Sequence, residues 1–233
     1  MNKTRNIDIK LYAFLSLFLT IFVLLFTIYS LCFVATYSVL PTPTYVIVLD
    51  AGHGGADGGV VAKSGVCESE LNLIYAQLLT KRLQSLNIAV VNTRQNKDGL
   101  YGELTNGFKL RDMRKRREII RQANPNLLVS IHMNKFSSSS RCGPQVFFQE
   151  KDEVSQKFAL TMQKVLNDFT GNAHECLSGE FYILQCVASM PCIIVECGFL
   201  SNEREAELLS SPDYQAQLVE AIFNGIMLYL YST

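Results

Sequence analysis

Three residues able to bind a metal or carry a proton stand at or near the ends of apolar stretches. His53 follows "YVIVLDAG", His132 ends "LLVSIH", and Glu196 lies in "PCIIVEC". Continuous apolar stretches of this length are typical of strands buried on both faces, and ligands of open α/β sheets sit beyond the carboxyl ends of the strands. We therefore expect two imidazoles and one carboxylate to converge at one edge of a sheet.

A fourth group, Glu68, begins the helical segment that follows a glycine-rich turn. Two neutral imidazoles and one carboxylate with one open position form a typical catalytic zinc site. We predict that His53, Glu68 and His132 bind one Zn²⁺ ion, while Glu70 points elsewhere. The ion would lower the pKa of its bound water from about 15.7 to about 7. Glu196 would take the proton of that water and pass it to a leaving amine.

Simpler interpretations of these residues exist. A single histidine at the end of a strand is more often a surface residue than a ligand, but here two of the three histidines occupy such positions. A glutamate flanked by apolar residues is costly to bury unless it is paired or binds a metal. The third histidine, His174, lies in the polar stretch "GNAHEC", and we expect it to be exposed. The turn contains Gly52, Gly54 and Gly55, which would let the backbone pass close to the metal.

The elements that must position these residues alternate between strands and helices. The predicted strands are 45–50, 88–93, 127–132, 145–149, 191–197 and a short one at 181–184. The predicted helices are 68–86, 109–123, 153–170 and 213–229. Alternation of this kind indicates an α/β fold with a twisted, mostly parallel sheet of about six strands and helices on both faces.

The N-terminal region is strongly apolar. No charged residue lies between Lys10 and Asp50, and the apolar stretch Leu11–Tyr37 exceeds the roughly 20 residues that cross a bilayer. Three basic residues precede it, so we expect the N-terminus in the cytoplasm and the rest of the chain outside. A cleaved signal peptide is the alternative, although its apolar region would span only about 7–15 residues; the chain would then be secreted. We assign residues 1–44 to a cytoplasmic N-terminal tip, a membrane anchor and a short linker, and residues 45–233 to the catalytic domain.

Charge and cysteine content restrict the partners and the redox state. Residues 45–233 carry 18 basic and 20 acidic residues, which gives no attraction to nucleic acid. The basic stretch Arg111–Glu118 spreads its charges around a helix, which favours a solvated face over a groove for an anionic polymer. Six cysteines follow the apolar segment, and they would suit a disulfide framework. Cys192 and Cys197 share one strand at an odd spacing and should face opposite sides, so we favour free thiols.

Four linked motifs resemble a known family, the zinc-dependent N-acetylmuramoyl-L-alanine amidases of the type 3 group. The motifs are "VLDAGHGGADGG" (Val48–Gly59), "ESELNL" (Glu68–Leu73), "SIHMN" (Ser130–Asn134) and "VECGFLSNEREAELL" (Val195–Leu209), with a "TR" pair at Thr93 and Arg94. The resemblance runs from about Tyr45 to the C-terminus and selects Glu68 over Glu70. The sequence departs from the family at Ala51, where proline is usual, and at Lys135, where a small residue is common.

The resemblance implies a function. Enzymes of this family hydrolyse the amide between the lactyl group of N-acetylmuramic acid and L-alanine in peptidoglycan, so the partner would be a glycan strand with its peptide stem. His53, Glu68 and His132 would be the zinc ligands and Glu196 the catalytic residue. Asn134 would orient the substrate, or would only form a hydrogen bond in a turn.

Similarity to a subgroup gives a finer expectation. A single catalytic domain with a short anchor is similar to the germination-specific amidases of spore formers, which prepare cortex peptidoglycan for muramic-δ-lactam formation and would have sporulation partner proteins. Three alternatives remain open: a vegetative autolysin, a zinc peptidase that cuts within the stem, and a wall-binding module with a decayed site.

Overall fold

The structure is a computed structural model that describes residues 2–37, 45–185 and 190–232, with side chains of the first segment described for residues 9–31. The chain divides into two compact units, Met1–Thr42 and Pro43–Thr233. The first unit holds helix α1 (Asn2–Tyr37), in which Ile9–Leu31 is long and apolar enough to cross a membrane. The short linker predicted before residue 45 lies outside the described residues.

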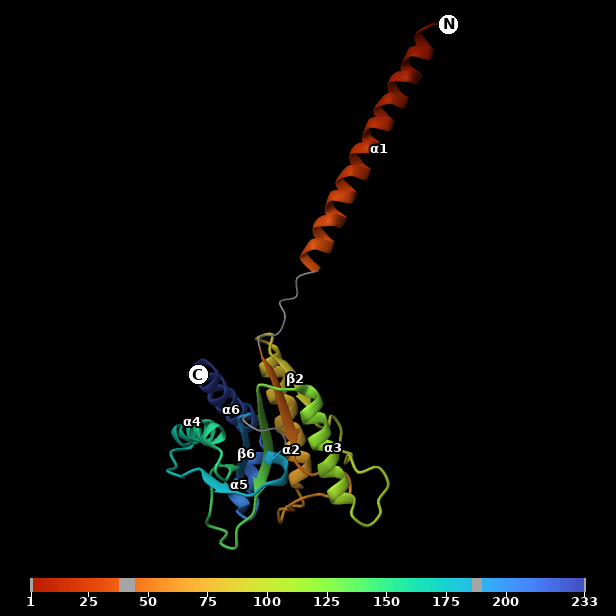
Figure 1. The fold of residues 1–233 in the computed structure, drawn as a ribbon. Helices are drawn as coiled ribbons and strands as arrows, with labels where there is room; N and C mark the ends of the chain where they lie inside the picture. Colours follow the sequence, from red (N-terminus) through yellow and green to blue (C-terminus); the bar gives the residue numbers. More distant parts are fainter. Residues whose placement is uncertain (1, 38–44, 186–189, 233) are drawn as a thin grey trace. The chain divides into compact units, whose positions relative to one another are not determined.

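A six-stranded sheet forms the centre of the second unit (Figure 1). Its strands are β1 (Val46–Ala51), β2 (Ala89–Asn92), β3 (Leu127–Asn134), β4 (Gln145–Gln149), β5 (Leu177–Gly179) and β6 (Cys192–Phe199), in the order β2-β1-β3-β6-β4-β5. The pair of β4 and β6 is antiparallel and the four other pairs are parallel. The predicted mostly parallel α/β sheet is therefore confirmed.

Three short elements differ from the prediction. One is the helix α5 (Glu203–Ser210), which was not predicted. Residues 181–184 do not form a strand, because Tyr182–Gln185 form the 3₁₀ helix η1, while β5 precedes them and was not predicted. A run of four residues shows too little periodicity to separate a strand from a helical turn. Ile183 and Leu184 are nevertheless buried, so the apolar pattern gave the burial of this segment correctly.

Helices cover both faces of the sheet, but unequally. They are α2 (Glu68–Gln84), α3 (Phe108–Ala123), α4 (Glu153–Thr170), α5 (Glu203–Ser210) and α6 (Pro212–Ser232). The larger apolar core lies between the sheet and α2, α4 and α6, and the smaller one lies between the sheet, α3 and η1. Figure 1 shows α3 on one side of the strands and α4 and α6 on the other.

Successive side chains of the central strands point alternately into these two cores. In β1, Ile47 and Leu49 face the larger core while Val48 faces the smaller one. Cys192 and Cys197 divide in the same way, as predicted from their odd spacing. In agreement with our expectation, no disulfide joins the five cysteines whose side chains are described: Cys67, Cys142, Cys176, Cys192 and Cys197.

A buried ionic network joins the smaller face of the sheet to α3. The Asp50 carboxylate accepts hydrogen bonds from Arg116 (2.8 Å), Ser130 (2.7 Å) and Thr93 (2.6 Å). Arg116 also donates to the carbonyls of Ala51 and His53. The expectation of a solvated face for Arg111–Glu118 is thus wrong for Arg116, whose side chain is 1% exposed. Its burial is tolerated because its charge is paired and its donors are satisfied.

A second buried arginine holds the same loop from the other side. Arg94 donates to the carbonyls of Ala51 (2.8 Å), Gly52 (3.0 Å) and Ser69 (2.7 Å). Burial and the nearby Arg116 charge lower the pKa of Arg94 to about 10, so this guanidinium remains charged at neutral pH. The backbone that follows β1 is therefore fixed by two cations before any ligand binds.

Replacement of Asp50 by Asn should change how stability depends on pH. Burial alone would raise the pKa of Asp50, but the Arg116 charge and the hydrogen bonds from Ser130 and Thr93 lower it to about 2. Above a pH of about 4 the carboxylate then contributes about 2 kcal/mol to the free energy of unfolding. That contribution is lost as the pH falls from about 4 to about 2, because the unfolded chain takes up the proton first.

The measurement is denaturant unfolding of the purified chain between pH 2 and pH 6, with a chelator present. Asp50→Asn should show a smaller loss of stability over this range than the unsubstituted chain. Asp168→Asn is the control, because Asp168 forms only an exposed ion pair with Lys164. Equal losses in Asp50→Asn and the unsubstituted chain would contradict the proposed contribution.

Candidate active site

The loop after β1 adopts a conformation that few residues tolerate. His53 has φ of 61°, in the left-handed region, and Gly54 and Gly55 also have positive φ. A Cβ atom at Gly52 would collide with the ring of His132. The absence of a side chain at Gly52 therefore allows this backbone to pass directly against the His132 ring. The sequence had predicted only a close approach of the backbone to the metal.

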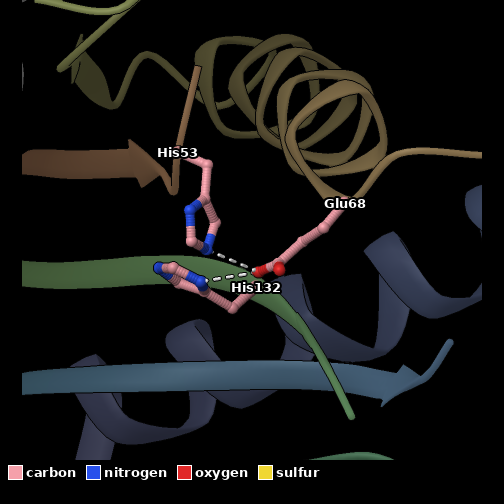
Figure 2. Close-up of side chains that lie close together, drawn as sticks. All are labelled: His53, Glu68 and His132. Atoms are coloured by element: carbon pink, nitrogen blue, oxygen red, sulfur yellow. Dashed lines mark hydrogen bonds and ion pairs between the residues drawn. The ribbon is translucent and has the colours of Figure 1, made fainter. Parts of the chain in front are cut away.

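Three of the predicted site residues converge from three separate elements. Figure 2 shows His53 from the loop after β1, Glu68 from the first turn of α2, and His132 from β3. Glu68 Oε1 lies 3.1 Å from His53 Nε2 and 2.8 Å from His132 Nδ1, and the two rings are 5.0 Å apart. One donor atom from each residue lies within 4.8 Å of the others.

The environment of Glu68 keeps it ionised. Its side chain is 3% exposed and accepts backbone hydrogen bonds from Val60 (2.8 Å) and Met133 (3.2 Å). Burial opposes ionisation, but the hydrogen bonds and charges of His132 and His53 hold the pKa of Glu68 well below its ordinary value. Glu70 points away, as predicted, and its carboxylate forms an exposed ion pair with Lys97 (2.6 Å).

These three donors fit a divalent metal. Imidazole nitrogen and carboxylate oxygen are the ligands of catalytic zinc sites, which keep one position open. Burial lowers the pKa of His53, but hydrogen bonds and charges of Glu68 and Asp57 raise it overall, so the acidic groups favour positive charge here. A divalent cation held by His53, Glu68 and His132 would supply such a charge.

Asp57, which was not predicted as a site residue, orients His53. Its Oδ2 lies 2.9 Å from His53 Nδ1, and its Oδ1 accepts a hydrogen bond from Lys109 of α3 (2.8 Å). A carboxylate on one ring nitrogen fixes the orientation of a histidine whose other nitrogen binds a metal. The signal was present in the sequence, because Asp57 stands four residues after His53 in the same glycine-rich stretch.

Glu196 lies next to the three converging residues. The register of the parallel strands pairs Glu196 of β6 with His132 of β3, so both side chains lie on the face toward α3. Glu196 Oε2 is buried and has no hydrogen-bond partner among the described residues. Burial, with a smaller effect of the Glu68 charge, raises the pKa of Glu196 to about 7. A carboxyl group with this pKa is suited to proton transfer near neutral pH.

The other polar residues singled out from the sequence have local contacts. Asn134 ends β3, and its Oδ1 accepts a hydrogen bond from the backbone of Lys135 (2.7 Å), while its role toward substrate stays a prediction. His174 is half-buried rather than exposed, because its Nε2 lies 2.7 Å from the carbonyl oxygen of Cys142.

A cleft of about 410 Å³ opens beside the two histidines on the α3 side of the sheet. Aromatic residues form much of its wall: Tyr101, Phe108, Phe181 and Tyr182. Lys109, Asp112 and Arg116 bring the polar side of α3 to the same cleft. The arrangement combines a candidate metal centre, a carboxyl group that can exchange protons, and space for a ligand larger than water.

Comparison with known proteins agrees with this geometry. The family model described as N-acetylmuramoyl-L-alanine amidase matches residues 47–227. The germination-specific N-acetylmuramoyl-L-alanine amidase of Bacillus subtilis is 34% identical over 196 residues, which cover 82% of this chain and 81% of that protein. The amidase LytC of the same organism is 27% identical and is matched over 81% of this chain and 36% of its own length.

A solved structure shows the same fold. The CwlD amidase from Clostridioides difficile, in complex with the GerS lipoprotein, superposes with a TM-score of 0.77 and 32% identity. The superposition covers 82% of this chain and 100% of that one. Fold, family motifs and relatives thus agree, and the chain belongs to the N-acetylmuramoyl-L-alanine amidase family, whose members hydrolyse the amide between muramic acid and L-alanine in peptidoglycan.

Proposed function

We propose that this amidase depends on one zinc ion per chain, held by His53, Glu68 and His132. The observation that carries the proposal is the approach of one donor atom from each residue to within 4.8 Å of the others. When bound, zinc supplies Lewis acidity, which acidifies water and polarises a carbonyl group. Glu68 supplies the negative charge of the site, and its backbone hydrogen bonds hold its carboxylate in place.

The proton transfers of the reaction belong to Glu196 in this proposal. Its carboxylate takes the proton from the attacking water and passes it to the amine nitrogen of the departing L-alanine. The buried oxygen without a partner and the pKa of about 7 both suit a group that accepts and then releases a proton. The register that places Glu196 beside His132 brings this carboxyl group next to the metal site.

We further propose a location at the membrane and a role in the spore cortex. Residues 1–44 would form the cytoplasmic tip, anchor and linker, and 45–233 the extracytoplasmic domain, supported by the apolar helix Ile9–Leu31. The germination-specific relative from Bacillus subtilis supports the preparation of cortex peptidoglycan for muramic-δ-lactam formation. A complex of the Clostridioides difficile relative with a lipoprotein supports a sporulation partner, which co-purification from sporulating cells would reveal.

Glu196→Gln should retain zinc and lose turnover. The amide cannot take a proton, and loss of a general base costs about 10²- to 10⁴-fold in rate. Zinc content by elemental analysis and the release of L-alanine-terminated peptides from peptidoglycan are the two measurements. Glu70→Gln is the matched control, because Glu70 lies in the same region but forms only an exposed ion pair. Full activity of Glu196→Gln on muropeptides would refute its role.

Asp57→Asn should weaken zinc binding by about 10- to 100-fold, as changes in groups behind metal-bound histidines do. The reason is that the amide no longer provides the charged acceptor that orients His53. Competition with a chromophoric chelator measures the affinity directly, without an activity assay. Asp98→Asn, an exposed position in the loop between β2 and α3, serves as the control. Unaltered zinc affinity in Asp57→Asn would show that the contact does not support the ligand.

A strain that lacks this gene should form spores whose cortex contains no muramic-δ-lactam. Muropeptide analysis by mass spectrometry measures this loss, and restoration of the full-length gene should reverse it. The complementing protein is expected in the membrane fraction. Normal lactam content would instead favour the vegetative autolysin, and truncated stems on treated peptidoglycan would favour a peptidase that cuts within the stem.

A further inference from the structure

Positive charge in the catalytic unit is concentrated on α3. This helix contains seven basic and two acidic residues, whereas residues 45–233 as a whole contain 18 basic and 20 acidic ones. The helix lies beside the catalytic cleft, because Lys109, Asp112, Met113 and Arg116 line it. Seven of the 18 basic residues of 45–233 thus lie on the one helix that borders the cleft.

Several of these cations have structural partners. Arg116 is buried against Asp50 and Asp112, and Lys109 holds Asp57. Arg111 donates to backbone carbonyls of the loop at 101–106. Arg114 and Arg117, in contrast, form no ion pair with any carboxylate in the part of the chain that the structure describes. Two guanidinium groups therefore remain for a ligand.

Arg114 and Arg117 share a cavity with Arg121, spaced three and four residues apart along one face of α3. We name this cavity of about 400 Å³ the arginine pocket, and its remaining lining residues are Glu118, Gln122 and Tyr182. The one carboxylate in it, Glu118, is already engaged by Lys115 (2.9 Å) and Gln122 (3.1 Å). The pocket therefore has a net positive charge.

The Arg117 side chain is held in position without an anion. Its guanidinium lies 4.3 Å above the centre of the Tyr182 ring and donates a hydrogen bond to the carbonyl of Gln185 (2.8 Å). Its Nε is buried and has no hydrogen-bond partner among the described residues. An ordered guanidinium stacked on an aromatic ring loses little further entropy when it binds a carboxylate.

The arginine pocket adjoins the catalytic cleft, because Tyr182 lines both cavities. The amide that this family cleaves joins the peptide to muramic acid through the peptide's N-terminus. The far end of a bound peptide whose C-terminus is not joined to another chain therefore carries a free carboxylate. A peptide that leads away from the metal along α3 would bring this negative group toward the arginine pocket.

We propose that the arginine pocket binds a carboxylate of the stem peptide, and that Arg114 and Arg117 determine preference for stems with a free acidic end. This inference rests on the proposed function, since it takes the cleft as the site of the scissile amide. Guanidinium groups bind carboxylates through paired, charge-assisted hydrogen bonds. A phosphate-bearing wall polymer offers similar charge, but the shared Tyr182 wall favours the substrate of the neighbouring cleft.

The test compares two sets of soluble muramoyl peptides of increasing stem length, one with a C-terminal carboxylate and one with a C-terminal carboxamide. The zinc-loaded full-length chain should show a KM about three- to tenfold lower for the acid at the stem length that reaches the pocket. The combined substitution Arg114→Gln and Arg117→Gln should bring the acid-to-amide ratio close to one. Added salt should reduce the ratio for the unsubstituted enzyme.

Lys81→Gln is the control for a general loss of positive charge, because Lys81 is exposed on α2 at the opposite face of the sheet. It should keep the preference. Equal KM values for acid and amide at every stem length would overturn the proposal. An equal increase in KM for both substrates in the double variant would also overturn it. A double variant that keeps the acid-to-amide ratio but no longer binds a polyphosphate probe would overturn it in favour of a phosphate-bearing polymer.

The ratio also separates this inference from the proposed function. Dependence on a different metal would change the rates on both substrates together, and a vegetative role would change neither rate. The acid-to-amide ratio can be measured in both cases. Cleavage within the stem instead of at the muramoyl amide would contradict the proposed function and would be visible in the masses of the products.

Discussion

The ionic contact between Arg116 and Asp50 is the constraint on which the site depends. It buries a full positive charge beneath a glycine-rich loop and directs the remaining guanidinium donors at the carbonyls of Ala51 and His53. The left-handed conformation of His53 is uncommon for a residue other than glycine, so other loop conformations would be favoured without this contact. Paired burial makes those conformations costly, because any other loop path leaves the arginine donors unsatisfied.

The ionisation state of each group in the site depends on its charged neighbours and on its burial. Glu68 is stabilised by two imidazoles, and His53 is held between two carboxylates. Glu196 lies next to them, but burial outweighs the attraction of the histidines and raises its pKa to about 7, so both of its protonation states are populated near neutral pH. One site thus contains a carboxylate that stays ionised and a carboxyl group that can change its protonation state, and the difference follows from hydrogen bonding and burial.

Much of this arrangement could be predicted because strand ends are readable in a sequence. The apolar runs before His53 and His132 and around Glu196 fixed which residues reach the same edge of the sheet. Burial of Arg116 could not be predicted, since periodicity places a charge on a helix face but does not say which charges find partners. Asp57 stands four residues after His53, but no periodic pattern in the glycine-rich loop indicates that the two side chains meet. The helix α5 and strand β5 are short enough to lack a distinct periodic pattern.

The unequal cover of the two sheet faces has a consequence for how such a protein can change. Three helices seal one face and supply most of the apolar burial. The other face bears α3 and η1, whose cluster is small and whose outer residues surround the cleft and the arginine pocket. The apolar contacts that stabilise the fold therefore lie mainly on one face of the sheet, and the cleft residues that determine ligand specificity lie mainly on the other. Substitutions on the face covered by α3 and η1 can therefore change specificity, while the helices on the other face preserve the architecture.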